Sequence, residues 1–178
     1  MRKYQLQIIN EDAMARLGKC LAESLYSGSI IYLQGDLGAG KTTLVRGILR
    51  ALGHQGVVKS PTFTVVEPYS VEQGKIKVYN KNKSRNDNRN RIYHFDLYRL
   101  IDPEELEYLG IRDYLDGTAI ALVEWPEKGQ GILPAADMSI TISYQKRGRK
   151  VDFEARNDKG TAIIDSLKKF YTDNNLNN

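Results

Sequence analysis

The sequence is poor in the residue types that form disulfides and dedicated metal sites. Cys20 is the only cysteine, so the chain cannot form an internal disulfide or supply a multi-cysteine zinc site. This scarcity indicates a reduced, cytoplasmic protein that is stabilised by packing. His54 and His94 are the only two histidines and add little capacity to bind a metal.

Long hydrophobic runs are also lacking. Segments such as 119–123 are among the longest apolar stretches, and they fall far short of the about 20 residues that a bilayer crossing needs. The first ten residues, MRKYQLQIIN, contain no apolar stretch of the signal-peptide type. The sequence therefore predicts neither membrane insertion nor secretion.

Positive charge is concentrated in one segment. Residues 75–91 hold seven Lys or Arg side chains against one acid, Asp87, a net charge of +6 in a chain whose total is +4. The remainder of the chain is therefore slightly acidic. A smaller basic cluster, KRGRK at 146–150, surrounds Gly148 and is typical of a hairpin turn.

The length of 178 residues and the hydrophobic content of 41% fit one domain, which would bury roughly 70% of the surface that its unfolded chain exposes. We predict a single domain over residues 1–172, with a basic β-ribbon or loop insert at about 72–90 and a polar tail at 173–178. The chain is expected to be monomeric on its own.

Hydrophobic periodicity predicts alternating helices and strands. Apolar residues recur every three or four positions after Asn10, which predicts a helix capped by that residue. Short apolar runs predict strands at 29–33 and 119–123, and helical composition predicts a helix over 42–52. Further strands are predicted at 62–71, 75–79, 91–97, 138–144 and 150–155, and further helices at 103–109 and 161–171.

The strongest motif is GDLGAGKT at 35–42, which matches the phosphate-binding P-loop pattern G-x-x-x-x-G-K-[ST] between a predicted strand and a predicted helix. Its glycines let backbone N–H groups turn toward phosphate oxygens. Lys41 can reach the β- and γ-phosphates, and the Thr42 hydroxyl can bind Mg²⁺. The alternative is a tight turn with a solvated lysine. The predicted nucleotide-binding residues are Gly35, Asp36, Leu37, Gly38, Ala39, Gly40, Lys41, Thr42 and Thr43.

Helices that alternate with apolar strands favour an α/β fold, a three-layer P-loop NTPase-like domain. Some connections are too short to cross over between parallel strands, so a mixed β-sheet is expected.

Two carboxylates follow predicted strands and are candidates for metal binding or catalysis beside the phosphates. Glu124 follows the apolar run 119–123, and Asp96 follows Ile92 to Phe95. In open α/β sheets, ligands bind at the carboxyl ends of strands. One acid could then hold Mg²⁺ while the other orients or deprotonates a water. Residue types alone leave open which acid does which, and either could be a surface acid or a helix cap.

Other residues carry weaker signals. Thr62, in the segment SPTFT at 60–64, could sense a γ-phosphate, or the segment could be an ordinary strand start. Trp125 could stack at the site or serve only in packing. Arg99 could neutralise phosphate charge or pair with Asp102. His94 is expected to be a hydrogen-bonded residue of the sheet.

Taken in order, the blocks GDLGAGKTTLVRG, SPTFT, HFDLYRL and VEWPE resemble the TsaE family of small bacterial ATPases. The resemblance covers nearly the whole chain except the basic insert. It implies a P-loop α/β protein that supports tRNA threonylcarbamoyladenosine synthesis with a TsaB–TsaD heterodimer. ATP and Mg²⁺ would be its cofactors, and the transfer chemistry would lie on another chain.

The same resemblance implies roles for individual residues. Lys41, Thr42 and Thr43 would bind phosphate and metal, with Glu124 as Mg²⁺ ligand and Asp96 as catalytic carboxylate. Thr62 would be a switch residue, and Trp125 part of the nucleotide or switch site.

The insert from about Glu72 to Asn90 is longer and more basic than the resemblance leads us to expect. It is either a solvated loop or a contact for the tRNA phosphate backbone. Rival functions are a small-molecule kinase, a GTPase and a non-enzymatic RNA-binding module. The sequence shows no acceptor-binding constellation for a kinase and no N-K-x-D motif for guanine, and a pure RNA module would leave the P-loop without a purpose.

Overall fold

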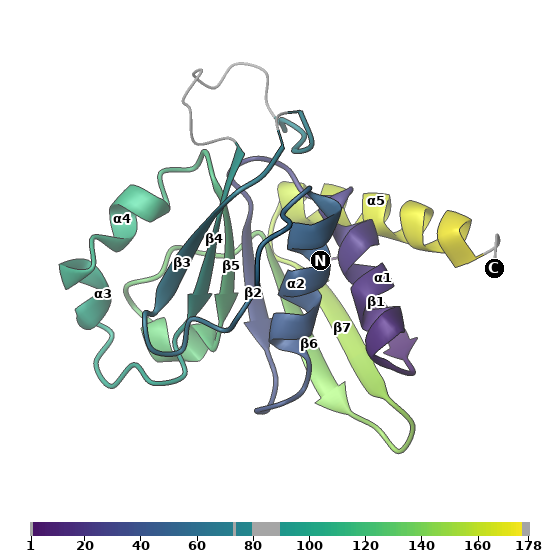
Figure 1. The fold of residues 1–178 in the computed structure, drawn as a ribbon, viewed down its shortest axis with the longest axis horizontal. Helices are drawn as coiled ribbons and strands as arrows, with labels where there is room; N and C mark the ends of the chain where they lie inside the picture. The colour runs from purple at the N-terminus through teal and green to yellow at the C-terminus, as the bar shows by residue number, and fades with distance from the viewer. Residues whose placement is uncertain (1, 73, 80–89, 176–178) are drawn as a thin grey trace.

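A mixed β-sheet forms the centre of the structure, a computed structural model that describes residues 2–72, 74–79 and 90–175 (Figure 1). Within these residues the sheet has seven strands in the order β1-β7-β6-β2-β5-β4-β3. The strands are β1 (Lys3–Ile8), β2 (Ile30–Gln34), β3 (Val66–Ser70), β4 (Arg91–Asp96), β5 (Ile120–Glu124), β6 (Met138–Tyr144) and β7 (Arg149–Ala155). The helices are α1 (Glu11–Ala22), α2 (Lys41–Ala51), α3 (Glu105–Tyr108), α4 (Ile111–Tyr114), the 3₁₀ helix η2 (Pro126–Gly129) and α5 (Asp158–Asn175).

The sheet is parallel in the middle and antiparallel at both edges. Strands β6, β2, β5 and β4 pair in parallel, whereas β1, β7 and β6 pair antiparallel, as do β3 and β4. The register aligns Glu124 of β5 with Leu33 of β2 and with Asp96 of β4. Three neighbouring parallel strands therefore end at the same edge of the sheet. The prediction of a mixed sheet is confirmed.

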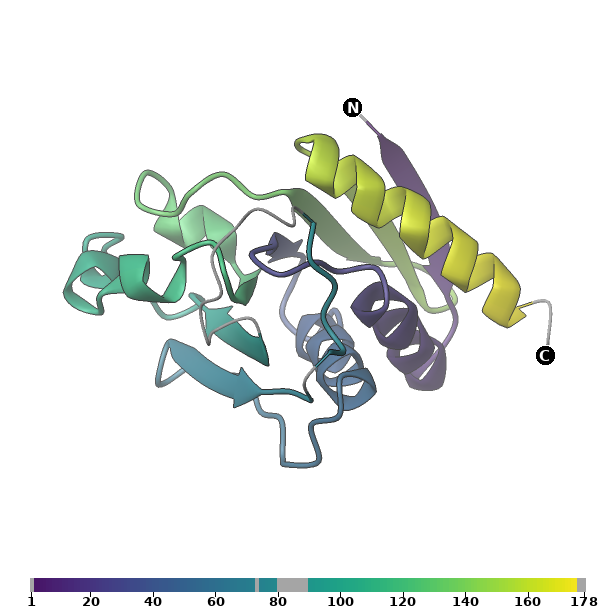
Figure 2. The ribbon, with the colours of Figure 1, turned by 90° about the horizontal axis from the view of Figure 1, so that it is seen from above.

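Helices pack on both faces of the sheet and give the predicted three layers. Helices α1, α2 and α5 share one core with Leu33, Leu122 and Phe153 of the strands. Phe95 and Val123 point to the opposite face and pack with Leu106 of α3 in a second core. Seen from above, α1 and α2 lie on one side of the strands, and α3 and α4 on the other (Figure 2). None of the described helices combines the length and apolar character that spanning a bilayer requires.

Several predicted elements are confirmed and one is longer than expected. The side chain of Asn10 accepts a hydrogen bond from Ala13 N at 2.8 Å, which caps α1 as predicted. The predicted hairpin forms from β6 and β7. Helix α5 begins at Asp158 and continues to Asn175, beyond the predicted range 161–171 and into the expected polar tail.

The N-terminal strand β1 and the short helix α4 were not predicted. Strand β1 pairs antiparallel with β7, from Lys3 opposite Glu154 to Ile8 opposite Arg149. Its inward side consists of Tyr4 and Leu6, which are half-buried against the core, and Ile8, which is buried. Helix α4 begins after Gly110, which has a positive φ of 68° and turns the chain between α3 and α4.

Two predicted strands differ from the structure. The strand predicted over 62–71 begins only at Val66, because residues 62–64 form a turn. In that turn Val65 N donates to Pro61 O at 2.7 Å, and Val65 has a φ of 66°. The strand predicted over 75–79 is wrong: only an isolated bridge between Tyr26 and Lys77 forms. Residues 80–89, which the sequence places at the tip of the basic insert, lie outside the described residues.

Helices α1 and α2 cross at two glycines, and this contact generates a stability prediction. A Cβ atom on Gly18 would lie 2.8 Å from the backbone of Gly47, and one on Gly47 would lie 2.9 Å from Ala15 O. Because backbone atoms cannot yield like a flexible side chain, Gly18→Ala should lower the free energy of unfolding by about 1–3 kcal/mol in urea denaturation. Arg16→Ala, on the exposed side of α1, is the control. Equal stability of Gly18→Ala and wild type would contradict this packing.

Candidate nucleotide-binding site

The glycine-rich loop between β2 and α2 has the backbone that the P-loop pattern predicts. Gly35 has a φ of 134°, and a Cβ there would lie 2.2 Å from Ile142 O of the neighbouring strand β6. Gly40 has a φ of 112° and immediately precedes α2. The loop therefore delivers the chain into the helix at the carboxyl end of β2. The first N–H groups of α2 have no partner within the helix, and such groups are suited to bind an anion.

The β6–β7 hairpin holds this loop from the side. The Tyr144 hydroxyl donates to Leu37 O at 2.9 Å, and Arg149 Nε donates to Ala39 O at 3.0 Å. The Arg149 guanidinium also lies 4.1 Å from the centre of the Tyr144 ring. Sequence reasoning missed both residues, and its only signal was the basic cluster at 146–150.

Lys41 is folded back onto the loop. Its ammonium group donates to Gly35 O at 2.7 Å and to Asp36 O at 2.9 Å. It also lies 4.1 Å from the centre of the Trp125 ring. Burial lowers the pKa of Lys41, and the nearby carboxylates of Glu124 and Asp96 oppose that shift. The side chain is a buried cation whose present partners are neutral carbonyl oxygens and an aromatic ring.

Glu124 lies at the end of β5, against the start of α2. Thr42 Oγ1 donates to its Oε1 at 2.8 Å. His94 Nε2 lies 2.8 Å from the same oxygen, and both His94 and Glu124 are buried. The expectation that His94 is a hydrogen-bonded residue of the sheet is confirmed. The structure thus brings together the two residues that the sequence singled out as metal ligands, Thr42 and Glu124.

Asp96 ends β4 directly beside Glu124 and is held by hydroxyl groups. Thr62 Oγ1 donates to Asp96 Oδ2 at 2.7 Å, and the Ser60 hydroxyl donates to the same oxygen. Tyr98 N donates to the other oxygen, Oδ1, at 3.1 Å. Ser60 was not singled out by sequence reasoning, although the SPTFT block contains it. The reason it matters is visible only in the fold, where the turn at 62–64 folds back onto the end of β4.

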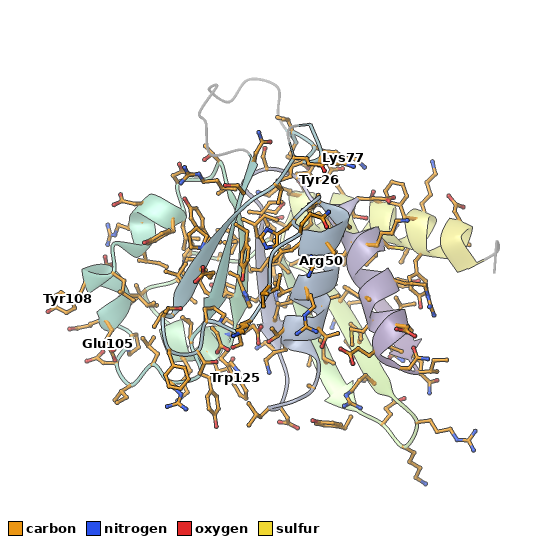
Figure 3. The ribbon with its side chains drawn as sticks, in the orientation of Figure 1. Tyr26, Arg50, Lys77, Glu105, Tyr108 and Trp125 are labelled. Atoms are coloured by element: carbon orange, nitrogen blue, oxygen red, sulfur yellow. The ribbon has the colours of Figure 1, made fainter. Side chains whose placement is uncertain are left out.

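Trp125 and Arg99 complete one wall of the site. Trp125 has a φ of 58°, directly after Glu124, and its ring lies 5.0 Å from that of Tyr98. Figure 3 shows Trp125 at the edge of the sheet where β2, β4 and β5 end. Arg99 stacks 4.3 Å from the centre of the Phe63 ring. Among the described residues it forms no ion pair with Asp102, so that alternative for Arg99 is wrong.

These residues surround a cavity of about 460 Å³. Its lining includes Lys41, Thr42, Asp96 and Glu124. A second hollow of about 270 Å³ adjoins the other side of the P-loop, where Thr43 lies. The first cavity thus combines a phosphate-binding loop, a buried cation and two buried carboxylates.

The donor set fits a magnesium ion that shares its coordination with a nucleotide. Thr42 offers a hydroxyl and Glu124 a carboxylate, which are the oxygen ligands that Mg²⁺ prefers. In the described part of the chain, no group of three or more His, Cys, Asp and Glu side chains could hold a metal by itself. Mg²⁺ is usually bound through one or two protein oxygens plus phosphates and waters, so this sparse set is what a Mg²⁺–nucleotide site requires.

Comparisons with known proteins agree with this architecture. The chain is 49% identical over 172 residues to the tRNA threonylcarbamoyladenosine biosynthesis protein TsaE of Haemophilus influenzae, covering 94% of this chain and 99% of that protein. It is 30% identical over 170 residues to the Bacillus subtilis protein of the same description, covering 95% and 96%.

A solved structure shares the fold. The crystal structure of Bacillus subtilis YdiB superposes with a TM-score of 0.72 at 25% identity, covering 94% of this chain and 95% of that one. This confirms the α/β fold class. Residues 8–151 match the sequence model of the family described as threonylcarbamoyl adenosine biosynthesis protein TsaE. Because that match spans most of the chain and includes the loop, both carboxylates and the residues Tyr144 and Arg149 that hold the loop, the chain belongs to the TsaE family.

Proposed function

We propose that this protein is an ATPase of tRNA threonylcarbamoyladenosine biosynthesis that supports the threonylcarbamoyl transfer carried out on other chains. The observation that carries the proposal is the 2.8 Å hydrogen bond from Thr42 to Glu124. It lies in a cavity that the P-loop lysine and Asp96 also line. The tRNA assignment rests on family membership, since relatives covered over nearly their whole length have that description.

Binding of ATP would use groups that are already oriented. Lys41 would exchange the carbonyl oxygens of Gly35 and Asp36 for β- and γ-phosphate oxygens, a stronger charge-assisted contact. Thr42 and Glu124 would hold Mg²⁺, which neutralises phosphate charge. Thr43 and the loop N–H groups would bind the remaining phosphate oxygens.

Asp96 is the proposed catalytic carboxylate. Its Oδ2 accepts hydrogen bonds from Ser60 and Thr62, which fix the carboxylate at the mouth of the cavity. It would orient a water for attack on the γ-phosphorus and take the proton of that water as the bond to ADP breaks. Thr62 is the proposed switch, because a hydroxyl that now binds Asp96 is in reach of the ligand cavity.

The proposed partners are a TsaB–TsaD type heterodimer and, through it, tRNA. Direct contact of the basic insert with tRNA also remains a proposal, since residues 80–89 lie outside the described residues. Two exposed apolar side chains line the site: Phe63 is 82% exposed and Leu37 is 67% exposed. Such side chains support a protein-binding surface beside the nucleotide.

Removing the P-loop ammonium should abolish hydrolysis. Lys41→Ala deletes a charge-assisted phosphate contact worth about 1.5–3 kcal/mol, so ATP should bind about 10- to 100-fold more weakly in calorimetric titration. Phosphate release, measured without any acceptor molecule so that kinase activity is distinguished, should fall to background. Lys128→Ala, an exposed cation on η2, is the matched control. Wild-type hydrolysis by Lys41→Ala would refute the P-loop assignment.

The two carboxylates should separate in their dependence on Mg²⁺. Glu124→Ala should weaken Mg²⁺-dependent nucleotide binding, because it removes the metal ligand beside Thr42. Asp96→Asn should bind Mg·ATP nearly as wild type does and hydrolyse it about 10²- to 10⁴-fold more slowly, the usual cost of losing a general base. Nucleotide binding is titrated with and without Mg²⁺, and single-turnover hydrolysis is measured on the same samples. The opposite pattern would exchange the two roles.

A further inference from the structure

His94 lies beneath the proposed metal ligand, on the same face of the sheet. In the parallel pair of β4 and β5, His94 is opposite Leu122 and Asp96 is opposite Glu124. Residues two apart on a strand share a face. His94 therefore faces the core beneath α2, one step deeper than Asp96, and its exposed fraction is 0%.

The imidazole ring holds one oxygen of Glu124 from the core side. Its Nε2 lies 2.8 Å from Glu124 Oε1, which also accepts the Thr42 hydroxyl. No residue in the described part of the chain donates to the second oxygen, Oε2, so the carboxylate has one oxygen fixed and one available. Thr42 and Glu124 line the ligand cavity, whereas His94 does not. The contact from His94 therefore comes from outside the cavity that a ligand would enter.

The surroundings of the ring define which nitrogen carries the proton. Nδ1 is buried and has no hydrogen-bond partner among the described residues, whereas Nε2 faces a carboxylate oxygen. A proton on Nδ1 would be a buried donor without an acceptor, which is costly. Of the two neutral tautomers, only the one with its proton on Nε2 therefore fits these surroundings, and that proton is donated to Glu124.

We infer that His94 is a positioning residue for the metal: it fixes Glu124 Oε1 by a hydrogen bond from the core and thereby directs Oε2 toward the cation. This inference rests on the proposed function, in which Glu124 holds Mg²⁺. Partners in a second layer of this kind fix the orientation of a ligating side chain, and their loss typically weakens metal binding about 10- to 100-fold.

The first test determines which ring nitrogen of His94 is protonated, in the protein without nucleotide or metal. Because the chain has two histidines, ¹⁵N NMR of imidazole-labelled protein gives two ring systems, and His54→Gln assigns them. The expected result is a His94 ring with a proton on Nε2. A ring with its proton on Nδ1 alone would overturn the proposal, and this measurement does not depend on ATP hydrolysis.

The second test measures metal binding directly, by EPR titration of Mn²⁺ in the presence of ADP. His94→Leu removes the donor and should weaken Mn²⁺ binding about 10- to 100-fold. His94→Gln restores an N–H donor of similar reach and should recover most of that loss. Binding of ADP in EDTA should be the same in all variants, which separates metal positioning from nucleotide binding.

Phe95→Leu is the matched control, since Phe95 is buried on the same strand but belongs to the core of the opposite face. It should lower thermal stability and leave Mn²⁺ affinity unchanged. The inference is overturned if His94→Leu binds Mn²⁺ as wild type does, if His94→Gln is no better than His94→Leu, or if Phe95→Leu weakens Mn²⁺ binding equally. Wild-type protein that binds no Mn²⁺ with ADP would instead refute the proposed function. If His94→Leu does not fold, His94→Gln and the wild-type tautomer still decide the question.

Discussion

The hydrogen bond between Thr42 and Glu124 is the constraint on which the rest of the site depends. It joins the first turn of α2 to the last residue of β5, and so fixes the position of the loop before the helix relative to the end of the sheet. Glu124 is buried, and an unpaired buried carboxylate is costly. Hydrogen bonds from Thr42 and His94 offset that cost. In the proposed function, the arrangement that stabilises the free protein is thus also the one that offers Glu124 to Mg²⁺.

Positive and negative charges are balanced over the site as a whole. Lys41 is buried among neutral carbonyls, and its pKa falls because of that burial although two carboxylates lie near enough to oppose the shift. Among the described residues no cation is bonded to Asp96, and its charge is stabilised by hydroxyl and N–H donors. The site therefore holds two cations, Lys41 and Arg99, and two anions, Asp96 and Glu124, and in the described part of the chain none of these four is ion-paired with another. In the proposed function, these charges would meet a triphosphate and its metal.

The sequence predicts the parts of this site that depend on residues close together in the chain, and it misses the parts that depend on residues far apart. The P-loop was recognisable because its geometry is local: glycines at 35, 38 and 40, a lysine and a threonine adjoin one another in the chain. The carboxylates were recognisable because each follows an apolar strand. Ser60 and Arg149 lie in segments that the sequence analysis noted, but they were missed because they act through contacts with residues far away in the sequence.

The same distinction explains the errors in the fold. Helix α1 and strands β4 to β7 follow hydrophobic patterns that the core reinforces. The strand predicted from Thr62 fails because Val65 adopts a positive φ, which its β-branched side chain disfavours and only tertiary contacts can impose. Strand β1 alternates the inward residues Tyr4, Leu6 and Ile8 with polar residues, a strand pattern that the sequence analysis did not use. The run at 75–79 has strand composition but, within the described residues, only Tyr26 as a bridge partner at Lys77.

The contacts from the β6–β7 hairpin to the P-loop affect when, during synthesis of the chain, the P-loop can reach its final shape. Tyr144 and Arg149 hold the carbonyl groups of Leu37 and Ala39 across sequence separations of 107 and 110 residues. The loop and α2 leave the ribosome early, but their supports on β5, β6 and β7 come much later in the chain. Contacts of such long range form only after most of the chain is available. A nascent chain that already contains the complete phosphate-binding motif should therefore be unable to hold it in shape until the hairpin has been made.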